Sequence, residues 1–272
     1  PDATIPIARM VASHVERIRE ELKYMYVTNV YRSAEFRNGE KREFIQAGIE
    51  FFGNARAEAD AETIQAAIQS TQACGFQEIR IDLGDTNYFN GLLQAIDESL
   101  AGKAEGIAVE GLEKEIKHQI RTLVESKNQP GLKDLLAQLP IEEIYKKTLL
   151  KLPLLFGNLE EILAEAEALA LNDRMRESVE NIRTVCRHLD DRSYLSADMG
   201  LVNHLDYYSG IIFNLYLKHS GVMAGSGGRY DGLMKKFGRP IPATGFGLNM
   251  DVIYEALLKR NQDPTGIDKS SI

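Results

Sequence analysis

Two segments near the C-terminal end constrain this chain more than any others. Residues 205–213 (LDYYSGIIF) carry two adjacent tyrosines, Tyr207 and Tyr208, and lead into the apolar run Ile211–Leu217, which is typical of a buried strand. Residues 225–232 (GSGGRYDG) are rich in glycine, which lets the backbone approach a neighbouring group closely because it lacks a Cβ. Together the segments predict a pocket faced by the tyrosines. A core strand followed by a tight turn explains the same residues.

Composition narrows the class of protein. The chain has 272 residues, 44% of them hydrophobic, which suffices for one large domain or two smaller ones. A formal net charge of −8 opposes non-specific attraction to phosphate backbones, so we expect no tRNA partner. Apolar runs such as residues 152–156 are too short to span a bilayer and no secretory leader opens the chain, so we expect a cytoplasmic protein without membrane contact.

Cys74 and Cys186 are the only cysteines, and their spacing fits no metal site, so we expect reduced thiols and no bound metal. The chain begins at Pro1 rather than at a methionine, which leaves open whether further residues precede it.

The first half of the chain shows two local patterns with polar residues at defined positions. Asp2 and Thr4 stand before an apolar helical pattern, which predicts a helix start. Residues 44–51 alternate, which predicts a strand with Ile45 on an apolar face and with Gln46 and Glu50 on the opposite, polar face. That polar face is either a ligand surface or simply exposed to solvent.

The other elements are predicted from periodicity and end signals. We expect a helix over residues 60–75 capped by Asp60, a strand over residues 78–83, helices throughout residues 98–190 with an N-cap at Asn158, and a strand over Leu195–Asp198. Asn249 should cap a final helix whose buried face carries Val252, Ile253, Ala256 and Leu257.

The pair LDYYSGIIF and GGRYDGL closely resembles the histidine-specific signature of histidyl-tRNA synthetases. The resemblance implies an α+β fold of the class II aminoacyl-tRNA synthetase type, an antiparallel sheet flanked by helices. Residues 1–97 and 191–272 would form this histidine-binding domain, and residues 98–190 would form an inserted helical subdomain.

The resemblance also implies a set of histidine ligands. Arg32 matches the family's carboxylate-binding arginine, whose planar fork suits a carboxylate. Thr4, Asp2 (where glutamate is usual) and Gln46 match residues at the amino group, and Glu50, Tyr207 and Tyr208 match residues that contact the imidazole.

Two positions depart from the synthetase pattern. Asn203 and Val252 stand where the family has arginines that stabilise charge during adenylate formation. As a further departure, we expect no anticodon-binding domain to follow. Loss of a cation that meets developing phosphoryl charge typically removes orders of magnitude in rate. The sequence therefore retains the residues that match the family's amino-acid ligands, but it lacks the two arginines with which the family stabilises charge during adenylate formation.

That combination resembles the regulatory subunits of short-form ATP phosphoribosyltransferase, the first enzyme of histidine biosynthesis. The resemblance implies a non-catalytic subunit without a cofactor, which forms a hetero-oligomer with a separate catalytic subunit, as a hetero-octamer, and self-associates as a dimer. L-Histidine would be its feedback effector. Two alternatives stay open: a catalytic histidyl-tRNA synthetase core that activates histidine with ATP, and a histidine-binding module that partners another enzyme.

Overall fold

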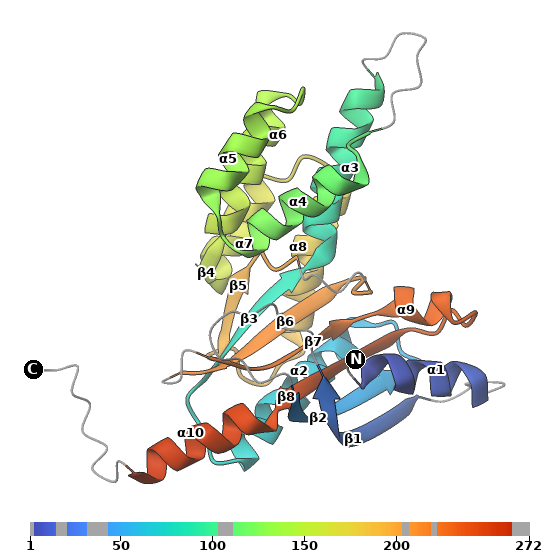
Figure 1. Cartoon of the computed structure of the whole chain (residues 1–272), viewed down its shortest axis with the longest axis vertical. Helices are drawn as coiled ribbons and strands as arrows, with labels where there is room; N and C mark the ends of the chain where they lie inside the picture. Colours follow the sequence, from blue (N-terminus) through green and yellow to red (C-terminus); the bar gives the residue numbers. More distant parts are fainter. Residues whose placement is uncertain are drawn as a thin grey trace, which may run out of the picture.

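A computed structural model of the chain describes residues 3–14, 21–31, 43–102, 111–202, 207–218 and 222–262, and the structural statements below concern these residues (Figure 1). A single eight-stranded sheet organises them, with the order β1-β2-β8-β7-β6-β3-β5-β4. The strands are β1 (Leu22–Tyr31), β2 (Glu43–Phe52), β3 (Ile79–Asp85), β4 (Phe156–Asn158), β5 (Leu195–Asp198), β6 (Ile211–Leu217), β7 (Met223–Arg229) and β8 (Ala243–Asn249).

The sheet is antiparallel between all neighbours except β3 and β5, which pair in parallel. The predicted α+β arrangement of an antiparallel sheet flanked by helices is therefore confirmed, with one parallel pair that the sequence did not predict. The strands predicted over Ile211–Leu217 and Leu195–Asp198 are confirmed at both ends.

Ten α-helices and one short 3-10 turn accompany the described strands. They are α1 (Thr4–His14), α2 (Ala57–Ala73), α3 (Thr86–Gly102), α4 (Lys114–Glu125), α5 (Gln129–Ala137), α6 (Glu143–Lys151), η1 (Leu152–Leu154), α7 (Leu159–Ala168), α8 (Asp173–Arg187), α9 (Asp231–Lys236) and α10 (Met250–Gln262). None of the described helices is both long and apolar enough to cross a bilayer.

Two helix starts follow local side-chain chemistry. The Asn158 side chain accepts hydrogen bonds from the backbone N–H groups of Glu160 and Glu161 at the start of α7. The Asn249 side chain does the same for Asp251 and Val252 at the start of α10. Both predicted N-caps are confirmed, because a cap depends on residues only two or three positions apart.

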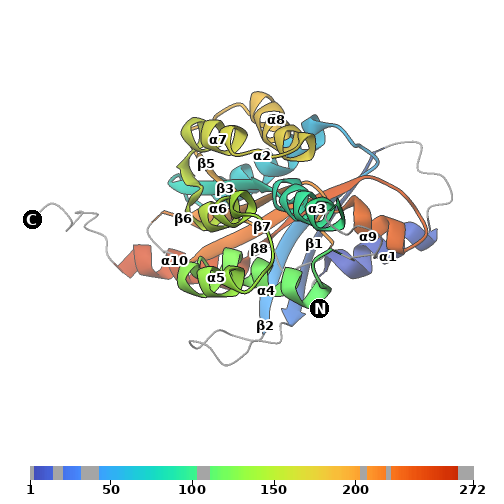
Figure 2. The same cartoon turned by 90° about the horizontal axis from the view of Figure 1, so that it is seen from above.

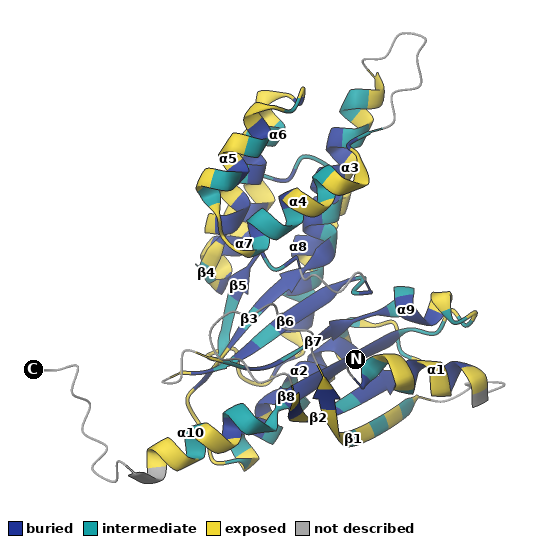
Figure 3. Ribbon diagram, in the orientation of Figure 1, coloured by how far each residue is buried: buried dark blue, intermediate teal, exposed yellow. Residues whose placement is uncertain are grey.

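Strand β8 separates two packed layers, as alternation of its side chains requires. Phe246 and Leu248 point into the large core, which also holds Ile64 of α2 and Ile253 of α10. On the other face a smaller cluster contains residues of α1 and α9 together with Phe52, Tyr207 and Tyr230. Figure 2 shows α1 and α9 lying side by side at one end of the sheet, and Figure 3 shows the buried central strands between the layers.

The helical segment of residues 98–190 stands at the other end of the sheet (Figure 1). Helix α3 runs across residue 98 without a break, and β4, which lies inside this segment, pairs with β5 of the main sheet. The segment is thus joined to the sheet both covalently and by strand pairing. Its description as a separate subdomain stays a prediction.

A lysine in the turn between α4 and α5 ties this segment to the sheet. Lys127 has a left-handed backbone with φ of 52°. Its ammonium donates to the buried Asp198 carboxylate at 2.8 Å and lies 3.6 Å from the centroid of the Phe156 ring. The backbone N–H of Gly200 donates to the other oxygen of Asp198 at 2.9 Å. The buried carboxylate is therefore compensated on both oxygens.

We expect Lys127→Met to lower the free energy of unfolding by about 1–3 kcal/mol at neutral pH, because it leaves Asp198 buried without its cation. Burial raises the pKa of Asp198, and Lys127 opposes the rise. A carboxyl whose folded pKa is raised favours the folded state when protonated, so the loss should shrink as pH falls through that pKa.

Urea unfolding at neutral and mildly acidic pH measures this effect, with Lys133→Met on the exposed surface of α5 as the matched control. A loss of stability that is the same at both pH values would contradict the role assigned to Asp198.

Candidate functional site

Five of the seven predicted histidine ligands converge on one pocket. Thr4 comes from the start of α1, Gln46 and Glu50 from β2, and Tyr207 and Tyr208 from the segment before β6. The two other predicted ligands, Asp2 and Arg32, lie outside the described residues, as does Asn203. Segments up to about 200 positions apart in the sequence therefore meet at this place.

Gly48 of β2 with Gly245 and Gly247 of β8, here called the glycine floor, leave room for these side chains. In the register of the sheet, Gly247 of β8 lies opposite Gly48 of β2, and Gly245 lies opposite Glu50. A Cβ at position 245 would collide with the Glu50 carboxylate, and a Cβ at position 247 would collide with the Gln46 amide. Glycine is required at position 245, where a Cβ would also meet the backbone oxygen of Ile49, and glycine at position 247 lets the Gln46 side chain lie flat across β8.

Glu50 is the centre of the hydrogen bonding in the pocket. Its side chain is almost wholly buried, with 1% exposed, and one carboxylate oxygen accepts the Thr4 hydroxyl at 2.6 Å. The other oxygen accepts the Tyr230 hydroxyl at 2.5 Å. Hydrogen bonds to a carboxylate are shorter and stronger than neutral ones, so Glu50 fixes both hydroxyls in place.

The possibility that the polar face of β2 is solvent-exposed is wrong. Gln46 is 8% and Glu50 1% exposed, whereas Ile45 on the supposedly buried face is 43% exposed. The cause is tertiary: α1 and α9 cover the polar face, while the opposite face of β2 is only partly covered near its start. Alternation alone states which residues share a face but not which face is covered.

Tyr230 is a site residue that the sequence argument missed. It is fully buried, and its ring meets that of Tyr207 edge-on, with centroids 6.0 Å apart. Burial, and then the charge of Glu50, raises the pKa of the Tyr230 phenol well above its usual value, so the hydroxyl remains a donor to the carboxylate. A signal was present, because Tyr230 lies inside the GGRYDGL motif, but nothing in its local pattern set it apart from a packing residue.

Tyr26 and Ser226 also line the pocket and were not predicted. Tyr26, on β1, donates a long hydrogen bond of 3.3 Å to the Gln46 side-chain oxygen. Tyr26 lies opposite Gly48 in the register, so its ring reaches over the same glycine floor. Only the pairing of β1 with β2 brings it there.

A buried ion pair behind the pocket holds the strand end that carries Tyr230. The Arg229 side chain binds both oxygens of Asp60 at 3.0 Å and also donates to the backbone oxygen of Asn54 at 3.1 Å. Burial raises the pKa of Asp60 to about 6, against the lowering effect of Arg229. The predicted N-cap role of Asp60 is wrong: α2 begins at Ala57, so Asp60 lies within its first turn, where its side chain is used across the fold instead.

The pocket is narrow in this conformation. Its free volume is about 20 Å³, which is room for about one water molecule. The rings of Tyr207 and Tyr208 lie 4.8 Å apart and tilt by 45°, which partly closes one side. A bound amino acid therefore requires the surrounding side chains to move apart.

Val252 lies at the start of α10, half-buried, with its apolar side chain packed against the large core. Its backbone N–H donates to the Asn249 side chain. A valine at this position offers no cation to a phosphate group.

Comparison with known proteins places these features in a family context. A family model described as histidyl-tRNA synthetase matches residues 1–253. The ATP phosphoribosyltransferase regulatory subunit of Acetivibrio thermocellus is 35% identical over 260 residues, which cover 94% of this chain and 59% of that protein. The corresponding protein of Thermoanaerobacter sp. (strain X514) is 36% identical over 273 residues, which cover 99% of this chain and 67% of that protein.

Among solved structures, an ATP phosphoribosyltransferase regulatory subunit/histidyl-tRNA synthetase from Bacillus halodurans is similar, with a TM-score of 0.80 and 32% identity. The alignment covers 94% of this chain and 64% of that one. The chain thus spans less than two thirds of the length of the Acetivibrio and Bacillus proteins.

The Glu50 network generates a stability prediction. We expect Tyr230→Phe to lower the free energy of unfolding by about 1–3 kcal/mol, because the buried Glu50 carboxylate loses one of its donors. Tyr88→Phe is the matched control, since Tyr88 is equally buried but donates to the neutral backbone oxygen of Ala166 at 2.7 Å. For Tyr88→Phe we expect the free energy of unfolding to fall by only about 0.5–1.5 kcal/mol. Chemical denaturation of both variants compares the two losses of stability, and an equal or larger loss for Tyr88→Phe would contradict the role assigned to the Tyr230 hydroxyl as a donor to Glu50.

Proposed function

The chain belongs to the histidyl-tRNA synthetase family, where it groups with the regulatory subunits of ATP phosphoribosyltransferase, and on this basis we propose that it binds L-histidine as a non-catalytic regulatory subunit. The observation that carries the proposal is the convergence of Thr4, Gln46, Glu50, Tyr207 and Tyr208 on one pocket. Histidine would act there as the feedback effector of the first step of its own biosynthesis.

The polar and aromatic groups of the pocket suit an amino acid with an imidazole ring. Glu50 accepts hydrogen bonds only, so it would accept from an N–H of the ligand, and the tyrosine rings would pack against the imidazole. Gln46, with Thr4 and Asp2, would bind the amino group, and Arg32 would bind the carboxylate. Because buried polar groups go unpaired when a ligand lacks their partners, such a site rejects analogues without ring nitrogens by a factor of about 10⁴.

Thr4 and Glu50 are hydrogen-bonded to each other, which bears on how a ligand would enter. An incoming N–H group would compete with the Thr4 hydroxyl for the same carboxylate oxygen. Since the pocket holds only about 20 Å³, opening would involve Tyr208 and Tyr26, the half-buried rings at its margin. Binding would therefore be coupled to a local movement of β1 or of the segment before β6.

The absence of a cation at position 252 supports a regulatory rather than a synthetase role. An arginine at the matching position would meet the phosphates of ATP, whereas Val252 packs its side chain on the core. Electrostatic groups of that kind supply much of the rate in phosphoryl chemistry. A synthetase core, the second candidate function, would use the same histidine ligands but would need a cation at position 252.

A regulatory subunit needs partners, and these are part of the proposal. The names of its relatives support a hetero-oligomer with a catalytic ATP phosphoribosyltransferase subunit, in which that subunit carries out catalysis. We also propose self-association as a dimer, a hetero-octameric assembly, a cytoplasmic location and no tRNA partner, the last supported by the net charge of −8. Feedback requires only that histidine bind one quaternary state more tightly, by about 1–3 kcal/mol.

We expect L-histidine to bind the full chain saturably in isothermal titration calorimetry, and Gln46→Ala to weaken it about tenfold, the equivalent of one lost hydrogen bond. Gln72→Ala, on α2 and bonded to Tyr194 away from the pocket, should leave the affinity unchanged. If no heat is seen with wild-type protein, alone or with its catalytic partner, the histidine site is excluded. An equal effect of both substitutions would mean that the pocket is not the site.

We further expect no histidine-dependent exchange of pyrophosphate into ATP, because Val252 provides no phosphate contact. The same preparation, reconstituted with a catalytic ATP phosphoribosyltransferase subunit, should make that enzyme sensitive to histidine, and Gln46→Ala should shift the inhibition curve by about tenfold without loss of assembly. Measurable exchange would favour the synthetase core instead. Histidine binding without any effect on the catalytic subunit would point to a module serving another enzyme.

A further inference from the structure

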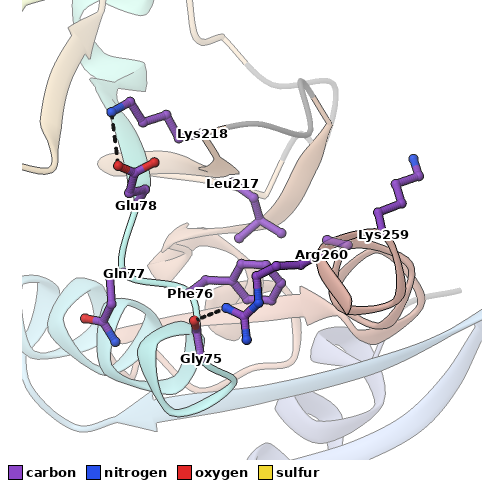
Figure 4. A pocket seen from close by; sticks show the side chains of 9 residues that line it. Gly75, Phe76, Gln77, Glu78, Leu217, Lys218, Lys259 and Arg260 are labelled. Atoms are coloured by element: carbon purple, nitrogen blue, oxygen red, sulfur yellow. Dashed lines mark hydrogen bonds and ion pairs between the residues drawn. The ribbon is translucent and has the colours of Figure 1, made fainter. Parts of the chain in front are cut away.

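A second cavity lies at the corner where three elements meet. The connection between α2 and β3, the end of β6, and the last turns of α10 enclose a volume of about 420 Å³ (Figure 4). Volumes of about 300–1,000 Å³ are typical of pockets for small molecules. Its lining residues are Gly75, Phe76, Gln77, Glu78, Leu217, Lys218, Ala256, Lys259 and Arg260.

The floor of this cavity is apolar. In Figure 4, Phe76 and Leu217 point into the space between the end of β6 and α10. Ala256 of α10 also lines the cavity. A ligand with an aromatic or aliphatic body would remove this surface from water, which is favourable in proportion to the apolar area covered.

One wall is held in a fixed geometry by Arg260. Its guanidinium donates to the backbone oxygen of Gly75 at 2.6 Å and lies 5.4 Å from the centroid of the Phe76 ring. Gly75 has a φ of +92°, a backbone conformation that residues with a side chain rarely adopt, and it lies just after the end of α2. The turn at Gly75 and the Arg260 side chain thus hold each other in place and form one wall of the cavity.

The rim is positively charged although the protein as a whole is acidic. Three cations, Lys218, Lys259 and Arg260, line the cavity against the single carboxylate of Glu78, in a chain of net charge −8. Lys218 pairs with Glu78 at 3.5 Å. Lys259 has no hydrogen-bond or ion-pair partner among the described residues, so its ammonium is available to a ligand.

This cavity is separate from the histidine pocket. It shares no lining residue with that pocket and lies on the α2 and α10 side of the sheet, whereas the pocket lies on the α1 side.

We propose that this cavity binds a small anion with an apolar or aromatic body. The body lies against Phe76, Leu217 and Ala256, and the anionic group lies at the rim, within reach of Lys259. Lys259 extends from α10 toward solvent (Figure 4), and its flexible stem lets the ammonium turn to an anionic group at the rim. The anionic group can be a carboxylate, a sulfonate or a phosphate monoester, which share the chemistry that the rim recognises.

The test uses naphthalene sulfonate as the probe and its neutral analogue naphthalene methanol as the comparison, both followed by calorimetry with the full chain. We expect the sulfonate to bind at one site and the neutral alcohol to bind more weakly. Lys259→Glu should weaken the sulfonate about fivefold, since it replaces an attraction with a repulsion at an exposed position. Lys147→Glu makes the same charge change on the exposed surface of α6, remote from the cavity, and should leave binding unchanged.

Filling the cavity gives an independent check. Ala256→Trp places an indole in the volume and should abolish binding of the probe, with the circular dichroism spectrum showing that the helix is retained. No saturable binding to wild type would overturn the proposal. Equal weakening by Lys259→Glu and Lys147→Glu, or undiminished binding to a folded Ala256→Trp, would overturn it as well. Histidine takes no part in these measurements, so their outcome is distinct from that of the proposed regulatory role.

Discussion

The buried carboxylate of Glu50 is the constraint on which the site depends. A carboxylate removed from water is strongly unfavourable unless donors compensate it. Here the donors are the hydroxyls of Thr4 and Tyr230, which lie 46 positions before and 180 positions after it in the sequence. The start of α1, the last part of β2 and the residue that follows β7 are therefore tied to one another at a single point. A ligand of the kind proposed would have to offer donors of its own in place of these.

Other interactions keep that point in register. The Nε–H of Arg229 is shared between both oxygens of Asp60, and this ion pair joins the end of β7 to α2, directly beside Tyr230. Gly245 and Gly247 of β8 leave room for the β2 side chains to lie across the sheet. The Gln46 amide and the Glu50 carboxylate therefore both lie directly against the backbone of β8. The polar residues of the pocket are thus positioned by neighbours that would not themselves touch a ligand, and loss of any such neighbour would move the donors rather than remove them.

The two faces of β8 have different chemistry, and this separates two kinds of site. On the face of α1 and α9 the pocket is small, polar and aromatic, with a buried acid at its centre. On the face of α10 the second cavity is larger and apolar, with cations at its rim. Because β8 runs directly into α10 through the Asn249 cap, one continuous segment contributes to both sites. The helices of residues 98–190 are anchored elsewhere, through Lys127 on Asp198.

The sequence by itself determined the elements whose signals are local. The strand Ile211–Leu217, the caps at Asn158 and Asn249, and the shared face of Gln46 and Glu50 all follow from residues within a few positions of one another, and the motifs around the tyrosines indicated the fold class. Tertiary structure decided that the face with Gln46 and Glu50 is the covered one, that Asp60 pairs with Arg229 instead of capping α2, and that Tyr26 and Tyr230 join the pocket. The physical reason is that burial and the choice of a partner depend on which surfaces meet across the sheet, and periodicity along the chain carries no information about the surface on the other side.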